Sequence, residues 1–540
     1  MDFTGRLDVP LDVGWSTEPW QEQSPVESLS TTFHLPADRL GLGSQLLLEG
    51  LWWSATVTIN GQPLPPVTVG DVPATVGIGA HLRPGENTLQ ITVTGAGDTP
   101  LAVAHDGLSR RLSAAKGPWL IEPPVLQLRP EAFIERTWLV TEGAQVIPHA
   151  DVIDAPDGAQ VRFFAALDGT ILQELGTATV RGGSAVGAAT DWSGPRWSLA
   201  DPGLFMLGAE LRDASDAPLD VASVRTGVRA LSVDGSRLML DETPLPLLAV
   251  RVGRAERRPL SRWFRAISGS GANAVEFHGQ IIRQEDLDTA DALGLPVVVM
   301  GRCSGRSPKL NDLSAADLQQ LDAHDHRLAR FLAAHPSVVL LALEEHGPPS
   351  EHGARLARAP LREWSGRPPM TGVELPAGIA DLVDDGLRCG DADCGDAWIT
   401  EIFDRSLGDR GWPDAADALN EQIHAGATGG VAPRLPNISA SDAPPRVRRP
   451  LAAQVASSGQ RASSQVTVSG ASPGALLILQ APHAGTVGAF ADPDGAATLS
   501  LWHRGSGALS VEQTQQTVAL SPRRWDDFQP RGSTTAVTLP

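Results

Sequence analysis

The chain is long, acidic and poor in cysteine. It has 540 residues, which at about 100–200 residues per domain corresponds to three to five domains, and its formal net charge is −20 at pH 7. An acidic surface repels phosphate backbones and anionic lipid headgroups, so we expect no nucleic-acid partner and no membrane partner. Three irregularly spaced cysteines exclude a disulfide framework and a four-ligand zinc site. We expect no metal and no cofactor.

Turn-forming residues are abundant and long apolar segments are absent. The 55 glycines and 43 prolines are about 18% of the chain, above the roughly 12% that is average, which indicates many turns and short strands. The longest apolar stretches, such as 295–300 and 338–343, are far shorter than the roughly 20 residues that span a bilayer. The first residues lack the basic start and apolar run of an export signal, so we expect a cytoplasmic protein.

Residues 1–130 have the pattern of antiparallel β-sheet. Apolar residues alternate with threonines over Ala55–Ile59, and Asn60-Gly61 follows, a dipeptide that supplies the positive φ angles of a tight hairpin. The same alternation recurs over 88–94 after a turn at 84–87. A period of two with frequent turns predicts a β-sandwich, here of jelly-roll-like type.

The same pattern of short strands and turns continues over residues 131–232. Strand-like stretches lie at 161–164, 204–211 and 221–228, and Asp168-Gly169 forms a turn after the first of them. The length of this segment and its short strands predict an immunoglobulin-like β-sandwich.

The period changes over residues 233–435. Helical spacing at 286–293 is followed by a continuous apolar strand at 295–300. A helix that starts at Ser314 and Asp317 then leads into a second apolar strand at 338–343. Strands that alternate with helices and lack hairpin turns indicate parallel pairing, so we expect a (β/α)8 TIM barrel.

The end of the chain returns to β structure. Residues 436–455 are rich in proline, serine and arginine and have no apolar period, which predicts a linker. Residues 456–521 alternate again and predict a C-terminal β-sandwich module, followed by a tail at 522–540.

Several stretches carry a family resemblance. They are 46–94, with Leu-Leu-Leu-Glu-Gly-Leu-Trp-Trp and later Leu-Arg-Pro-Gly-Glu-Asn-Thr-Leu; Trp197 with 202–205 and 225–229; and His-Pro-Ser-Val-Val-Leu at 335–340. In this order they resemble the sugar-binding β-sandwich, the immunoglobulin-like domain and a barrel strand of glycoside hydrolase family 2. That family includes β-galactosidases, β-glucuronidases and β-mannosidases. The resemblance covers roughly residues 30–430 and identifies the chain as a divergent member.

The resemblance implies retaining hydrolysis of a β-glycoside. This chemistry uses two carboxyl groups about 5–5.5 Å apart, and on a barrel they come from the C-terminal ends of different strands. The resemblance implies Glu401, at the end of the apolar stretch 397–401, as the nucleophile. For the acid/base, the family pattern counted from His335 places His346 at the position of the proton donor. A shift of the pattern by one residue places Glu345 there instead.

Other positions depart from the family pattern. The family usually has a His-Glu pair in its first barrel strand, and the corresponding stretch 248–253 lacks it. Glu276 stands where the family has an arginine. The chain also has no tyrosine that could orient the nucleophile. The residues expected to contact a carbohydrate substrate are His346, His278, Arg251 and Trp398. Two hypotheses therefore stay open: an active β-glycosidase, and a catalytically inactive descendant that binds a carbohydrate or a protein.

Overall fold

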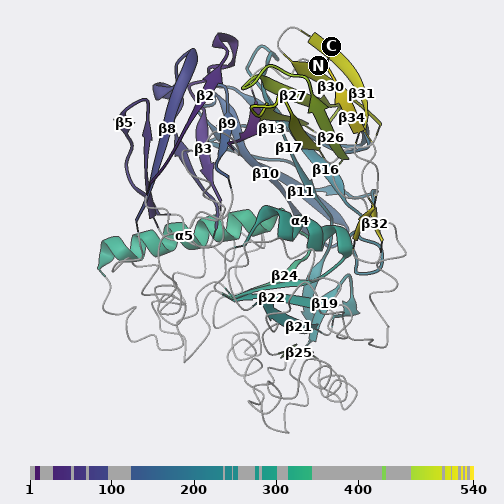
Figure 1. Cartoon of the computed structure of the whole chain (residues 1–540). Helices are drawn as coiled ribbons and strands as arrows, with labels where there is room; N and C mark the ends of the chain where they lie inside the picture. Colours follow the sequence, from purple (N-terminus) through teal and green to yellow (C-terminus); the bar gives the residue numbers. More distant parts are fainter. Residues whose placement is uncertain are drawn as a thin grey trace, which may run out of the picture.

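The structure is a computed structural model whose described parts are mostly β-sheet (Figure 1). It describes residues 6–11, 28–49, 54–68, 72–94, 123–234, 237–245, 247–252, 274–278, 282–300, 314–342, 429–432, 464–483, 485–501, 505–511, 514–520, 524–526, 529–531 and 535–539. Among these residues, no helix is both long enough and apolar enough to cross a membrane.

The first module is a sandwich of two antiparallel layers. One layer contains β1 (Leu7–Pro10), β9 (Val125–Leu128), β3 (Gln45–Leu48) and β7 (Ala74–Gly77) in that order. The other contains β2 (Ser28–Leu35), β8 (Gly85–Thr94), β4 (Ser54–Ile59) and β5 (Gln62–Pro63), with β6 (Val67–Thr68) paired to β4. Two short 3₁₀ helices, Ala37–Arg39 and Gly79–His81, lie in the connections.

The predicted alternation in β4 is confirmed by burial. Ala55, Val57 and Ile59 are fully buried in the core between the two layers, and the residues between them are half-buried. The hairpin turn after β4 has the expected left-handed backbone, with φ of 50° at Asn60 and 80° at Gly61. The β-sandwich expected in this part of the chain is therefore present.

The second module is another pair of sheets. One sheet contains β10 (Phe133–Glu142), β11 (Gln145–Ile153) and β14 (Ser184–Val186), with β15 (Thr190–Asp191) paired to β11. The other has the order β13 (Thr170–Thr179), β12 (Gln160–Leu167), β16 (Phe205–Arg212) and β17 (Pro218–Thr226). Their facing side chains form one apolar core that includes Phe163 and Phe205. A small sheet of β18 (Leu231–Asp234), β19 (Arg237–Leu240) and β20 (Thr243–Pro244) follows in the chain.

The third part is a parallel sheet with helical crossovers. Its order is β24 (Val338–Ala342), β23 (Val297–Met300), β22 (Ala274–His278), β21 (Leu247–Val252) and β25 (Gly429–Ala432), and every pairing is parallel. Helices α4 (Gln284–Leu293) and α5 (Ala315–Ala333) lie between this sheet and the β modules (Figure 1). The change to parallel pairing is confirmed. A complete barrel is not evident within the described residues. The apolar spacing over 259–268 also predicts a helix, and that stretch falls outside the described residues.

The C-terminal module joins the first sandwich edge to edge. Its strands β27 (Leu476–Ala481), β28 (Gly485–Phe490), β30 (Gly505–Val511) and β31 (Thr514–Leu520) continue the sheet that contains β1, through parallel pairing of Asp8 with Val487. Its other sheet contains β29 (Ala497–Leu501), β26 (Ser464–Ser469) and β34 (Thr535–Thr538). A separate hairpin pairs β32 (Arg524–Asp526) with β33 (Gln529–Arg531).

The segment 522–540 is therefore more than the tail that the sequence suggested. β34 pairs in parallel with β26, and Val537 is buried in the apolar core of the module. A strand of four residues with one buried apolar side chain leaves too weak a pattern to be recognised without its partner strand. The predicted linker at 436–455 lies outside the described residues.

Candidate functional site

In (β/α)8 barrels the reactive groups lie at the carboxyl edge of the parallel sheet, so we describe that edge of this sheet first. Arg251 stands near the end of β21, in register with Glu276 of β22, and His278 is the last residue of β22, in register with Met300 of β23. The backbone thus brings Arg251 and His278 to the same edge on neighbouring strands, and their contact with a substrate stays a prediction.

The predicted reactive residues lie beyond the ends of the described strands. β24 ends at Ala342, three residues before Glu345. Glu345, His346, Trp398 and Glu401 are outside the described residues, so their positions stay predictions.

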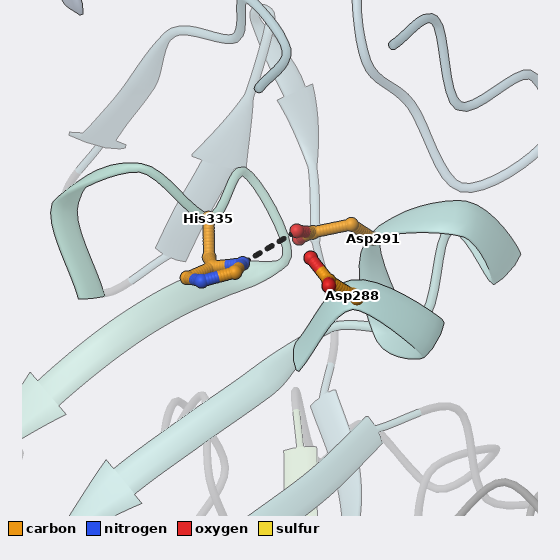
Figure 2. Close-up of side chains that lie close together, drawn as sticks. All are labelled: Asp288, Asp291 and His335. Atoms are coloured by element: carbon orange, nitrogen blue, oxygen red, sulfur yellow. Dashed lines mark hydrogen bonds and ion pairs between the residues drawn. The ribbon is translucent and has the colours of Figure 1, made fainter. Parts of the chain in front are cut away.

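A cluster of three titratable side chains lies at the opposite, amino end of the sheet (Figure 2). Asp288 and Asp291 come from α4, and His335 comes from the turn that connects α5 to β24. His335 Nδ1 lies 2.6 Å from Asp291 Oδ2, and the backbone N–H of Ser337 donates to Asp291 Oδ1 at 2.9 Å. His335 and Asp291 are both buried. The cluster fixes the point at which β24 starts.

The electrostatics of the cluster favour a charged pair. Burial alone acts to lower the pKa of His335, but the charge of Asp291 and the hydrogen bond to it outweigh burial, so the pKa of His335 is raised. Gln284 also places its side-chain amide nitrogen 3.1 Å from His335 Nε2.

Residues of the second β module contact this cluster and the backbone next to it. Arg225 forms an ion pair of 2.9 Å with Asp288, and the indole N–H of Trp197 donates to the backbone oxygen of Asp291 at 2.9 Å. Arg229 donates to the backbone oxygens of Pro336 and Val338, and its burial lowers its pKa to about 10. The stretches around Trp197 and at 225–229, which carried part of the family resemblance, thus join the second module to the parallel sheet.

The ligand atoms of the cluster lie within 4.8 Å of one another, a spacing that a metal ion could bridge. Each group already has a protein partner: Asp291 accepts at both oxygens, His335 faces Asp291 and Gln284, and Asp288 pairs with Arg225. An ion would have to displace these bonds. We therefore interpret the cluster as a structural joint rather than a metal centre.

Sequence analysis found only one side of this joint. His335 was recognised within the family-like stretch 335–340, whereas Asp291 was not singled out. The available signal was an aspartate among the apolar positions of the helix, because a buried carboxylate requires partners.

Comparisons with known proteins place the fold. No protein-family model matches the chain, and no curated protein matches it by sequence. Solved structures do match: β-glucuronidase from Ruminococcus gnavus in complex with D-glucaro-d-lactam is 15% identical, with a TM-score of 0.51 over 68% of this chain and 72% of that chain. The same enzyme with uronic isofagomine gives the same four values, and the complex with N1-substituted uronic isofagomine has a TM-score of 0.50 at 15% identity over 68% and 72%.

A likeness at this identity shows the fold. The resemblance to glycoside hydrolase family 2 is confirmed at that level, and the chain has a divergent family 2-like fold of several β modules attached to a parallel sheet.

Proposed function

We propose that the chain is a retaining β-glycosidase of family 2 type. Its parallel sheet belongs to a (β/α)8 barrel, Glu401 is the nucleophile and Glu345 is the general acid/base. The observation that carries the proposal is the strand order of the parallel sheet, in which β25, the last of its strands along the chain, pairs with β21, the first.

This order favours a barrel over an open sheet. From β21 to β24 each strand pairs with the next one along the chain, and right-handed crossovers in one direction place all helices on one face of the sheet. A doubly wound sheet instead reverses direction at a switch point. At about 30 residues per βα unit, the stretch 343–428 has room for three further units before β25 closes the circle.

The proposed barrel brings the reactive residues to one mouth. Glu345 follows β24 by three residues, and β24 ends at the edge where Arg251 and His278 stand. Glu401 would end the strand that precedes β25. For the retaining reaction the two carboxyl groups must lie about 5–5.5 Å apart, so that one attacks the anomeric carbon while the other protonates the leaving oxygen.

A β-glucuronide is the first substrate to test. The similar structures are β-glucuronidases, and the names of their ligands include uronic isofagomine, an acid-bearing compound. Arginine is the side chain best suited to pair with a carboxylate, and we propose that Arg251, at the end of β21, binds the sugar carboxylate.

A second candidate is an inactive descendant that binds a carbohydrate or a protein. Strict register places His346 at the donor position, Glu276 occupies the place of an arginine, and the chain has no tyrosine. These departures favour a site that binds its ligand but does not catalyse hydrolysis.

One set of variants separates the two candidates. The wild-type protein is assayed on aryl β-glucuronide, β-galactoside and β-mannoside, together with Glu401→Gln, Glu345→Gln and the neighbouring control Glu344→Gln. The active-enzyme proposal expects turnover of one substrate, losses of at least about 1,000-fold in Glu401→Gln and Glu345→Gln, and little change in Glu344→Gln. A wild-type protein that is inert on all three, yet binds one of the sugars in calorimetry with an affinity that Arg251→Ala lowers, supports the second candidate. Turnover that survives Glu401→Gln contradicts the proposed nucleophile.

A further inference from the structure

A cavity of about 180 Å³ lies where three parts of the chain meet, and none of its lining residues belongs to the parallel sheet. Its lining comes from three places: Arg6 and Asp8 at the start of the first module, Phe164 and Ser223 in the second module, and His483 and Thr486 in the turn and strand that follow β27. Because Asp8 and Val487 also form the pairing between β1 and β28, the cavity adjoins the seam that joins the C-terminal module to the rest.

The charged groups around the cavity are paired. Arg6 forms an ion pair of 2.8 Å with Asp220, and Arg129 pairs with Asp8. Behind Phe164, Arg162 pairs with Glu210 at 3.2 Å. An anion entering the cavity meets no uncompensated cation, and a cation meets no uncompensated carboxylate, so a neutral ligand fits the electrostatics best.

The uncharged polar groups are of the kind that recognise hydroxyls. Ser223 and Thr486 can each donate and accept a hydrogen bond, and a neutral imidazole at His483 can do the same. Burial, aided by the charge of Arg162, lowers the pKa of His483, which favours the neutral ring. Within the described part of the chain, the buried Nδ1 of His483 has no hydrogen-bond partner.

The backbone at His483 also suggests that its side chain is used. Its φ is 54°, in the left-handed region that glycine adopts most easily. The ring contacts Phe164 edge to face at a centroid distance of 5.4 Å. A histidine in a backbone conformation that favours glycine, at a position that lines a cavity, points to a role for the imidazole.

Size sets the last constraint. Pockets for drug-sized ligands measure about 300–1,000 Å³, so about 180 Å³ suits a ligand of roughly one ring. The side chains of Phe164, Val221 and Leu501 also line the cavity and add apolar surface to it. A pyranose has both kinds of surface, with C–H groups on its faces and hydroxyls around its edge.

We propose that this junction cavity binds one neutral sugar ring, as a free monosaccharide or as the end of a glycan. Ser223, Thr486 and His483 hydrogen-bond its hydroxyls, and the apolar lining residues contact its C–H face. Since its walls come from three parts of the chain, the cavity exists only while they are docked. Sugar binding therefore stabilises the attachment of the C-terminal module by mass action.

The test is calorimetric titration of the full chain with methyl β-glucoside, methyl β-galactoside and methyl β-mannoside, with glucuronate and inorganic phosphate as charged probes. Two proteins are titrated: one carries Glu401→Gln alone, and the other carries Glu401→Gln together with the double cavity variant Ser223→Ala/Thr486→Val. For a ligand of about a dozen non-hydrogen atoms we expect a Kd of about 2 mM for at least one neutral glycoside. The double variant should weaken this binding at least about 10-fold.

Two further variants keep the test decisive. Thr498→Val makes the same exchange at an exposed position of the same module and should leave the Kd unchanged. His483→Asn removes the imidazole while an asparagine tolerates the left-handed backbone, and it should also weaken binding if the double variant fails to fold. The proposal is overturned if no neutral glycoside binds saturably, if binding survives both cavity variants, or if a charged probe binds more tightly than the neutral sugars. Sugar binding lost with Arg251→Ala but kept in the cavity variants would assign it to the barrel mouth instead.

Discussion

Replacing Asp291 with asparagine should destabilise the joint between the second β module and the parallel sheet by about 2.5–6 kcal/mol. Asp291 is fully buried and accepts from both His335 Nδ1 and the Ser337 N–H. An asparagine keeps one acceptor oxygen but places an NH₂ group against one of these two donors. The change removes a charge-assisted hydrogen bond, worth about 1.5–3 kcal/mol, and leaves a buried donor without a partner, at about 1–3 kcal/mol.

The same substitution should change how stability depends on pH. The pKa of His335 is raised in the folded protein, because Asp291 outweighs the opposing effect of burial. A raised folded-state pKa stabilises the protein fully below the unfolded value of about 6.5, and this contribution is lost as pH rises through the folded value. Asp291→Asn should therefore flatten the fall in stability that the wild type shows above about pH 6.5.

Urea unfolding followed by far-UV circular dichroism at the helical minimum measures both effects. The chain has several modules, so the relevant transition is the one in which helical signal is lost, since α4 and α5 flank the parallel sheet. Asp288→Asn is the matched control: it lies on the same helix, its side chain is 37% exposed, and its pair with Arg225 should contribute only about 0–1 kcal/mol. An Asp291→Asn protein as stable as the Asp288→Asn protein, with the wild-type pH dependence intact, would refute this reasoning.

Two further substitutions probe backbone and buried polar groups elsewhere. Gly294 ends α4 with φ of 65°, and a Cβ there would lie 2.5 Å from the backbone oxygen of Leu199, whereas Gly61 has φ of 80° and open space around it. Gly61→Ala should cost about 1–2 kcal/mol from the backbone alone, and Gly294→Ala clearly more, as compared by thermal unfolding; equal losses would show that the close approach is absent. Asn87 is fully buried with four side-chain hydrogen bonds, one of them from Asn60, so Asn87→Ala should cost about 2–4 kcal/mol in a urea titration, and a loss below about 1 kcal/mol would contradict the network.

Local patterns predicted most of the elements that the structure describes. The alternation at Ala55–Ile59 and the apolar run of β23 are readable because burial on one or both faces of a strand imposes a period on the sequence. The predicted helix at 286–293 lies within α4, which begins two residues earlier with the backbone N–H of Gln284 donating to Glu49 of the first module. A partner so far along the chain leaves no local signal.

Contacts between modules were the part that sequence could not supply. The pairing of Asp8 with Val487 joins residues from opposite ends of the chain. The local sequence of either strand does not indicate which strand it pairs with. The junction cavity and the link from β34 to β26 follow from the same kind of long-range pairing. For the candidate site, Arg251 and His278 stand on the paired strands β21 and β22. Their contact with a substrate, like the approach of Glu345 to Glu401, stays a prediction.

The most direct test of the proposed function is to trap the reaction on the chain itself. A fluorinated slow substrate of the glycoside that the wild type turns over forms a glycosyl ester with the nucleophile of a retaining enzyme, and mass spectrometry of the digested protein locates that ester. The proposal predicts a single labelled peptide containing Glu401, with labelling strongly slowed in the Glu345→Gln protein. An ester on another carboxylate, or an inert protein that takes up no label from any of the three glycoside classes, would contradict it.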